Sequence, residues 1–387
     1  MKILIIGGTG VISFAVVNES IKHGHTVTCI NRGKSKSQKL PQEAELIIAD
    51  YRNKNTIVEK LKNRHFDVIV DFLCMNKNDI KYSVDLFKNK CNQYIFISSC
   101  AVYKKHGNSE SICDEDSSKI TPSWDYSIEK MECENYLIQL SKIYNFNYTI
   151  VRPAVTYGNT RIPYGITPSY GYHGTILQRL IHNKPIILWD NGEGYYNLTR
   201  VEDFAIGFVG LYGNPKAINE AFNIVGDETH TWKEVIELTA NILNVTPKYF
   251  NISSKQFAKE LPEKKGEISG RAAKIKISNK KLKSLVPQFK TNIPLKKGIE
   301  MTIRYYIEND YLYGIDYAFD GDWDRIIAKY DKNYTPRFID YLNNASKKDK
   351  DSYYNSLNKN IYIENIKRKI YKLINKTKRI IKYMLKK

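Results

Sequence analysis

The chain has 387 residues with a formal net charge of +19, and 42% of them are hydrophobic, which indicates a globular protein with a substantial core and excludes a disordered chain. No apolar run is long enough to cross a bilayer and Met1 leads directly into a strand pattern, so we expect a cytoplasmic protein without a signal peptide. The six cysteines are scattered without a Cys-x-x-Cys pair, which predicts reduced core residues and neither a disulfide framework nor a metal site.

The first predicted element is a buried strand over residues 2–6 that runs into a glycine turn and then into an apolar helix pattern. Gly7 and Gly10 permit a tight turn whose free N–H groups, at a helix start, suit a phosphate. Ser13 stands where the dinucleotide fingerprint has its last glycine, and it is small enough for close packing. An ordinary strand-to-helix turn is the alternative. The pattern favours a dinucleotide site at Gly7, Thr9, Gly10, Val11 and Ile12.

The second and third predicted strands, residues 26–30 and 44–49, end in residues that face the adenosine in such a site. Asn31 replaces the usual acidic residue and Arg32 follows it, which tilts the prediction toward NADP, although Arg32 is equally explained as a solvated loop residue. Asp50, followed by Tyr51, either meets the adenine amino group or caps the next helix.

Strands over residues 66–72 and 94–99 alternate with helical patterns, which predicts a parallel sheet covered on both faces. Ser99 ends the fifth strand, and a helix beginning near Asp125 carries Tyr126 and Lys130 on one face. An ammonium beside a phenol favours the phenolate, which a general base for an alcohol requires. Tyr212 with Lys216 has the same spacing by chance, so only the context of Tyr126 supports this function.

Together these motifs resemble an extended short-chain dehydrogenase/reductase of the NAD-dependent epimerase/dehydratase family. The resemblance covers roughly residues 1 to 330 and rests on motifs in a fixed order. They are Gly7-Gly8-Thr9-Gly10, Ser99 before Val102-Tyr103, Tyr126 with Lys130, the segment 151–158 with Arg152-Pro153, Val201-Glu202-Asp203, and the strand 221–226. The resemblance implies an α/β fold: a Rossmann-type doubly wound parallel sheet with a smaller C-terminal substrate domain, here followed by a basic helical tail.

The resemblance also implies the roles of individual residues. Tyr126 would take a proton from a sugar hydroxyl, Lys130 would hold the nicotinamide ribose of NAD or NADP, and Ser99 would bind the reacting oxygen. Pro153 would border the same cofactor. Dehydratases of the family carry Asp-Glu where this chain has Cys100-Ala101, so 4,6-dehydration is not expected. The expected substrate contacts are Ser99, Cys100 and Tyr126, together with Tyr196, which stands nearest to the position of the family's phosphate-binding arginine. Arg200 or Arg271 would supply the positive charge, although neither is in register with that position.

We divide the chain into a cofactor core over residues 1–160, to which 195–226 return, a substrate-binding part over 161–194 and 227–330, and an extension over 331–387. Residues 161–194 should form an insertion over the active site, in which Tyr170, Tyr172 and His173 either contact a sugar or pack a lid. Residues 343–360 read as a linker, and apolar positions from Ile366 to Met384 recur among lysines as in an amphipathic helix.

The predicted protein is therefore an NAD(P)-dependent sugar epimerase or oxidoreductase, with a nucleotide sugar as substrate and a homodimer as the expected assembly. The basic helix could lie on an anionic membrane surface or pack on protein. An RNA-binding protein on the same fold is the rival interpretation, because the net charge of +19 suits it, but the Ser99, Tyr126 and Lys130 set makes nucleic acid a disfavoured partner. A third interpretation is a redox sensor that binds NADP without catalysis.

Overall fold

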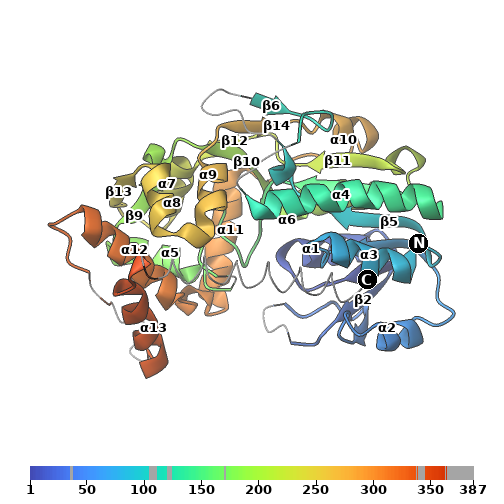
Figure 1. Ribbon diagram of the computed structural model, residues 1–387, viewed down its shortest axis with the longest axis horizontal. Coiled ribbons are helices and arrows are strands. Elements are labelled where there is room, and N and C mark those ends of the chain that lie inside the picture. The colour runs from blue at the N-terminus through green and yellow to red at the C-terminus, as the bar shows by residue number, and fades with distance from the viewer. Residues whose placement is uncertain are drawn as a thin grey trace, which may run out of the picture.

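The computed structural model describes residues 1–34, 38–103, 111–119, 124–169, 171–336, 338, 345–361 and 363. Its largest feature is a seven-stranded parallel sheet in the order β11-β7-β5-β4-β1-β2-β3, in the right half of Figure 1. The strands are β1 (Lys2–Ile6), β2 (Thr26–Asn31), β3 (Glu45–Ile48), β4 (Phe66–Asp71), β5 (Cys91–Ile97), β7 (Tyr148–Pro153) and β11 (Glu220–Ile224). The strand order reverses between β1 and β4, which confirms the predicted Rossmann-type doubly wound sheet.

Helices cover both faces of this sheet because successive side chains of a strand point to opposite faces. Ile3 and Ile5 of β1 pack into one core, whereas Leu4 and Ile6 pack into a second. The first core contains α1 (Val11–Lys22), α6 (Val201–Val209) and α10 (Lys280–Leu285); the second contains α2 (Lys54–Lys60), α3 (Lys77–Phe87) and α4 (Asp125–Tyr144). Parallel strands between two helical layers place any ligand at the carboxyl edge of the sheet.

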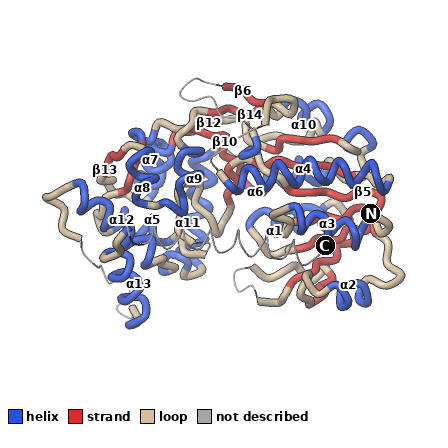
Figure 2. Tube along the Cα trace, viewed as in Figure 1, coloured by secondary structure: helices blue, strands red, loops and turns tan. Residues whose placement is uncertain are grey.

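The rest of the described chain forms a second lobe, mostly helical, in the left half of Figure 2. Its helices are α5 (Gly174–Ile181), α7 (Trp232–Ile242), α8 (Ser254–Glu260), α9 (Lys265–Arg271), α11 (Leu295–Glu308), α12 (Tyr317–Tyr330) and α13 (Lys347–Leu357). Its short strands, some of which run along the border with the sheet, are β6 (Ser111–Cys113), β8 (Val155–Tyr157), β9 (Ile186–Trp189), β10 (Tyr195–Arg200), β12 (Thr229–Thr231), β13 (Tyr249–Ile252) and β14 (Ile275–Ile277). Thr231 caps α7, with Glu234 completing the capping box.

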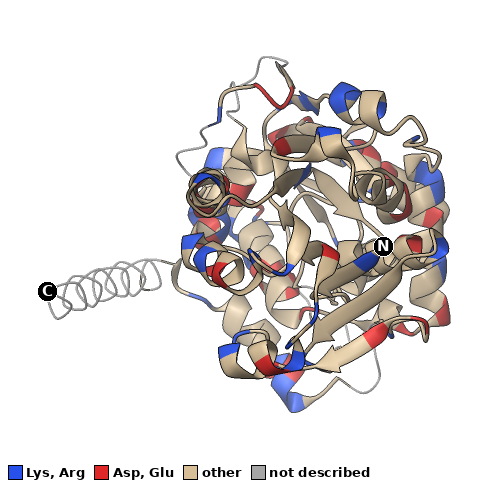
Figure 3. Cartoon of the chain, turned by 90° about the vertical axis from the view of Figure 1, so that its right-hand side faces the viewer, with Lys and Arg blue, Asp and Glu red and all other residues tan. Residues whose placement is uncertain are grey.

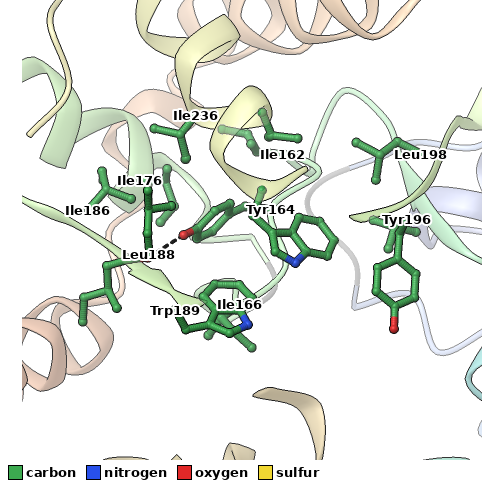
Figure 4. Packing of buried hydrophobic residues seen from close by; sticks show 14 of the residues in the cluster. Ile162, Tyr164, Ile166, Ile176, Ile186, Leu188, Trp189, Tyr196, Leu198 and Ile236 are labelled. Atoms are coloured by element: carbon green, nitrogen blue, oxygen red, sulfur yellow. Dashed lines mark hydrogen bonds between the residues drawn. The ribbon is translucent and has the colours of Figure 1, made fainter. Parts of the chain in front are cut away.

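Residues 161–194 form the centre of this lobe, although we expected an insertion over the active site. Tyr164 packs against Trp189 and Trp232 with ring centroids 5.7 and 6.4 Å away, and its hydroxyl donates to the carbonyl of Ile187 (Figure 4). His173 is buried, and its Nδ1 accepts a hydrogen bond from the Ile162 N–H at 3.2 Å, so packing is its role. Tyr172 is exposed, and Tyr170 lies outside the described residues.

The expected linker over residues 343–360 instead contains α13, which Ser346 caps and which packs on α12. Tyr353 of α13 is completely buried, and its hydroxyl donates to Oδ2 of Asp324 on α12 at 2.5 Å. Asp324 in turn pairs with Arg179 at 3.0 Å and with Lys184 at 2.7 Å, and all three side chains are buried. The predicted basic helix over 366–384 lies outside the described residues. Within the described part of the chain, no helix is long and apolar enough to span a bilayer.

Candidate cofactor and catalytic site

A cavity of about 1000 Å³ opens at the carboxyl ends of β1, β2, β3 and β4, beside the point where the strand order reverses. Nine predicted cofactor residues line it together: Gly7, Thr9, Gly10, Val11, Ile12, Asn31, Arg32, Asp50 and Tyr51. Leu73, which follows β4, and Arg161, which follows β8, also line the cavity. No motif marks either position, because only the tertiary fold brings them to the glycine turn. A cavity of this size is large enough for a dinucleotide.

The glycine turn has the geometry that close approach of a ligand requires. Gly7 has φ +87°, and a Cβ there would lie 2.9 Å from Leu73 Cδ2. The Ser13 hydroxyl donates to the Gly7 carbonyl at 2.6 Å and accepts from the Gly10 N–H at 2.9 Å. Ser13 therefore stabilises the turn through two hydrogen bonds, and its side chain is small enough for the position where the fingerprint has a glycine. The first intrahelical bond of α1 runs from the Phe14 N–H to the Gly10 carbonyl, so the helix start presents its positive end to the cavity.

The adenosine side of the cavity is formed by the ends of β2 and β3. Asn31 Oδ1 accepts from the Gly8 N–H at 2.8 Å, and its buried Nδ2 has no hydrogen-bond partner within the described part of the chain. Asp50 is exposed, and α2 is capped by Asn53, so the alternative role of Asp50 as a helix cap is wrong. The unsatisfied Nδ2 donor beside a glycine turn fits a ligand rich in hydroxyl and phosphate oxygens.

Helix α4 carries Tyr126 and Lys130 to the carboxyl edge of the sheet. The Lys130 side chain is buried, and its Nζ donates to the carbonyls of Cys74 at 2.6 Å and Ile97 at 2.9 Å, at the ends of β4 and β5. The same Nζ lies 6.0 Å from the centre of the Tyr126 ring. One N–H of the ammonium is left to bind a ligand oxygen or the Tyr126 phenol.

A buried ionic network, which the sequence analysis missed, fastens α4 to the sheet. Glu134, one turn beyond Lys130, binds Arg152 of β7 with two hydrogen bonds of 2.8 Å and accepts from the Ser98 hydroxyl at 2.5 Å. Burial disfavours the charged form of Glu134, but Arg152 and Lys119 outweigh this and hold the pKa of its carboxyl below its usual value. Ser127, Lys130 and Glu134 share one helix face, which was the available signal.

The other residues predicted on the sheet edge differ in their exposure to a ligand. Ser99 is 9% exposed, and its Oγ accepts from the Ala101 N–H at 3.1 Å, which leaves its proton free to bind a substrate oxygen. The Cys100 thiol instead donates to the carbonyl of Arg152 at 3.2 Å, and burial raises its pKa, so it contributes no reactive group. Pro153 is buried at the end of β7 and does not line the cavity.

Of the three candidates for a phosphate contact, Arg271 has the most suitable surroundings. Its guanidinium lies 5.1 Å from the Tyr196 ring centre and 5.8 Å from that of Trp124, and Trp124 contacts Tyr126. The buried Arg271 Nε has no hydrogen-bond partner within the described ranges. Arg200, by contrast, is buried and bonded to Glu202, Asn159, Thr302 and the Gly298 carbonyl. The Tyr196 hydroxyl donates to the Gly270 carbonyl, and its ring faces Arg271.

The model of the NAD dependent epimerase/dehydratase family matches residues 3–225, which include the glycine turn, Ser99, Tyr126 and Lys130. The chain belongs to this family. It is therefore an NAD-dependent enzyme of the extended short-chain dehydrogenase/reductase type, as the sequence motifs predicted.

The relatives of this epimerase/dehydratase chain are named for different functions. The chloroplast stem-loop binding protein of 41 kDa b of Arabidopsis thaliana is 29% identical over 66% of this chain and 68% of the relative. A UDP-N-acetyl-alpha-D-glucosaminuronate decarboxylase of Bacillus cytotoxicus is 26% identical over 80% and 99% of the two chains. The structure of UDP-glucuronic acid 4-epimerase from Bacillus cereus in complex with NAD superposes with a TM-score of 0.62 and 19% identity, covering 79% of this chain and 96% of the epimerase, which supports the fold.

Proposed function

We propose that this enzyme transfers a hydride between a carbinol carbon of a nucleotide sugar and a bound nicotinamide dinucleotide, as an epimerase or an oxidoreductase. The observation that carries the proposal is the position of Lys130. Its buried ammonium donates to the carbonyls of Cys74 and Ile97 near the carboxyl ends of β4 and β5, and the centre of the Tyr126 ring lies 6.0 Å away on the same helix. A cation held in this position serves both the cofactor and the phenol of a general base.

Each residue of the set has a distinct task in the proposed reaction. The Tyr126 phenolate removes the proton of the sugar hydroxyl, and the Lys130 ammonium stabilises that phenolate and binds the ribose next to the nicotinamide. The Ser99 hydroxyl donates to the sugar oxygen while it becomes a carbonyl. The bound dinucleotide supplies the hydride acceptor. Gly7, Gly10 and the start of α1 bind its pyrophosphate, and Asn31 contacts its adenosine ribose.

The residues at the substrate end of the site favour a sugar that carries a diphosphate. They do not favour dehydration of that sugar. Arg271 is the proposed phosphate ligand, because its guanidinium is one aromatic ring away from Tyr126 and has an unsatisfied Nε, whereas Arg200 is bonded to protein groups. Cys100 and Ala101 offer no acid for a leaving hydroxyl, so we propose epimerisation or redox chemistry at one carbon.

The proposal is tested by mixing the protein, saturated with NAD or NADP, with a panel of UDP-linked sugars that includes UDP-glucuronic acid and UDP-glucose. The absorbance of the reduced nicotinamide and the NMR spectrum of the sugar are followed together. An epimerase gives a new sugar stereoisomer with only a transient absorbance change, and an oxidoreductase gives one cofactor turnover per product. Tight dinucleotide binding with no response to any nucleotide sugar would contradict the substrate class.

RNA binding is the second candidate, because the relative from Arabidopsis is named for stem-loop binding and the net charge is +19. Along the described backbone in the view of Figure 3, however, Lys and Arg positions are interspersed with Asp and Glu positions. Salt-dependent binding of a stem-loop RNA by protein that retains no dinucleotide would favour this candidate over the enzyme.

The expected homodimer and the membrane-surface association of residues 366–384 also stay predictions. Sedimentation of the full chain tests the first. Binding to vesicles of anionic and of neutral lipid tests the second, since a basic amphipathic segment binds only the anionic ones strongly.

A further inference from the structure

We propose that Asp71, a buried carboxylate at the end of β4, is a positioning residue for Lys130. Its negative charge balances the buried ammonium, and its hydrogen bonds fix the segment whose backbone carbonyl receives that ammonium. The inference rests on the proposed role of Lys130 in the reaction. It adds to that role by naming the group that keeps Lys130 charged and in place.

The carboxylate of Asp71 is held in the core by neutral groups. Asp71 is completely buried. Its Oδ2 accepts from the hydroxyls of Ser83 at 2.7 Å and Tyr51 at 2.9 Å and from the Cys74 thiol at 3.2 Å, and its Oδ1 accepts from the Leu73 N–H at 2.7 Å. These donors favour the charged form of the carboxyl group, but none of them carries a positive charge. Asp71 has no ion pair within the described part of the chain.

Lys130 is the matching cation, because its buried ammonium also has no ion pair within the described ranges. Its Nζ donates to two backbone carbonyls, one of which belongs to Cys74. Glu134, one turn further along the same helix, is already bound by Arg152 at 2.8 Å and Lys119 at 3.0 Å. A buried charge is costly unless an opposite charge compensates it. The ammonium therefore needs another anion.

Cys74 connects the two charges. Its thiol donates to Asp71 Oδ2 at 3.2 Å, and its backbone carbonyl accepts from Lys130 Nζ at 2.6 Å. Burial raises the pKa of the Cys74 thiol well above its usual value, the charge of Asp71 acts in the same direction, and the charge of Lys130 acts in the opposite one. Opposite charges separated by one buried residue attract each other strongly, because the interior screens them less than water does.

The other titratable groups around Lys130 do not supply this anion. On α4, the centre of the Tyr126 ring is 6.0 Å from Nζ, and its phenol is the group that the ammonium would stabilise. Burial raises the pKa of the Cys133 thiol to about 12, so this group is neutral. On α3, Asp79 is paired with Arg52, with 3.6 Å between Oδ1 and Nη2. The buried carboxylate at the end of β4 is therefore the anion that matches the ammonium.

Asp71 also links Lys130 to the wall of the cofactor cavity. Tyr51 and Leu73, which both donate to Asp71, line that cavity. One carboxylate thus fixes two residues of the cavity wall and the residue whose carbonyl binds the ammonium. Its position in the core separates this role from direct contact with a substrate.

A double-mutant cycle tests the coupling without substrate or cofactor. Asp71→Asn and Lys130→Met are introduced singly and together into the full-length protein, and urea unfolding of each protein is measured. We expect the two substitutions to be coupled by at least about ten-fold in the unfolding equilibrium constant, with the double variant less destabilised than the sum predicts. Additive effects of the two substitutions would overturn the proposal.

Ser83→Ala combined with Lys130→Met is the matched control cycle. Ser83 donates to the same oxygen of Asp71 but carries no charge, so its removal disturbs the network and leaves the anion in place. The coupling in this cycle should be within about two-fold. Coupling as large as in the Asp71 cycle would show that packing, and not charge, joins the two positions, which would contradict the proposal.

The double variant also covers the case in which Asp71→Asn alone does not fold. A neutral pair at the two positions removes both buried charges, and such replacements of a compensated pair are tolerated. Circular dichroism of the protein with both Asp71→Asn and Lys130→Met should then show that folding is restored. A double variant that stays unfolded would contradict the coupling.

The pH dependence of hydride transfer gives a readout that a purely structural role of Asp71 would not change. The rate should fall at high pH, where the Lys130 ammonium loses its proton. Asp71→Asn should move this fall to lower pH by at least about half a pH unit, because the loss of a nearby anion disfavours the cation. Ser83→Ala should leave it in place, and an unmoved profile in Asp71→Asn would overturn the proposal. Absence of hydride transfer with every nucleotide sugar would refute the proposed function instead, and the double-mutant cycle would still decide the role of Asp71.

Discussion

At Ser13 and Asn31, single side-chain atoms decide what the glycine turn offers a ligand. The Ser13 hydroxyl closes the turn by bonding Gly7 and Gly10, and Asn31 Oδ1 takes the Gly8 N–H, so the turn is rigid before a ligand arrives. A pre-formed turn spends no binding energy on ordering its backbone. The sequence revealed these residues as departures from the family motif, but only the structure reveals that both departures fasten the turn.

His173 gives a prediction at the residue scale. Burial, together with the charges of Arg161 and Lys264, lowers its pKa to about 3. The unfolded chain binds a proton near pH 6.5 and the folded chain does not, so stability is full above pH 6.5 and is lost as the pH falls from there toward 3. Between pH 7 and pH 5 this residue should lower the free energy of unfolding by about 2 kcal/mol.

Urea unfolding at a series of pH values measures this effect. His173→Gln should flatten the acid limb of the stability curve, because glutamine does not titrate. His65→Gln is the control, since His65 is exposed. An unchanged acid limb in the His173 variant would show that other groups cause the loss of stability.

At the scale of elements, α4 is the part of the fold on which the proposed chemistry depends. Its contacts with the sheet edge come from successive turns: Ser127 donates to the Ala101 carbonyl, Lys130 to that of Ile97, and Glu134 accepts from Ser98. The helix is therefore held at the residue directly after Tyr126 and again at each of the next two turns. This spacing keeps Tyr126 and Lys130 in register with the ends of the strands.

Removal of Glu134 should be costly because it leaves the Arg152 guanidinium buried without its anion. We expect Glu134→Ala to lower the free energy of unfolding by about 3–5 kcal/mol. Glu129→Ala on the exposed side of α4 is the matched control and should change stability by less than about 0.5 kcal/mol. Chemical denaturation of both variants compares them, and similar small effects would mean that the network does not hold the helix.

At the scale of the whole molecule, the sheet was predictable and the second lobe was not. Strands such as residues 2–6 and 66–71 are short, mostly apolar stretches, a pattern that can be recognised in the local sequence. Tyr126 and Lys130 were recognisable because their spacing lies within one helix. The Glu134–Arg152 pair joins residues 18 positions apart, and the centre of the second lobe joins Tyr164 to Trp232, so neither has a local signal.

The extension was misread for the same reason. Residues 347–357 are polar, and the feature that orders them is one tyrosine that reaches the buried Asp324 on α12. Tyr353→Ala should therefore lower the free energy of unfolding by about 3–5 kcal/mol. Tyr354→Ala, at the 47% exposed neighbour, should cost far less. Thermal and chemical unfolding compare the two variants. Equal losses of stability in Tyr353→Ala and Tyr354→Ala would indicate that α13 does not form part of the folded core.

The central claim, that Tyr126 is the base for hydride transfer, is tested most directly by Tyr126→Phe. The variant is saturated with the dinucleotide that binds more tightly and mixed with the nucleotide sugar that the unaltered enzyme converts, while reduced nicotinamide is monitored. Tyr136→Phe, on the same helix, is the control. We predict a rate at least about 100-fold lower for Tyr126→Phe, with the dinucleotide dissociation constant within about two-fold of the original. An unchanged rate of hydride transfer would contradict the account.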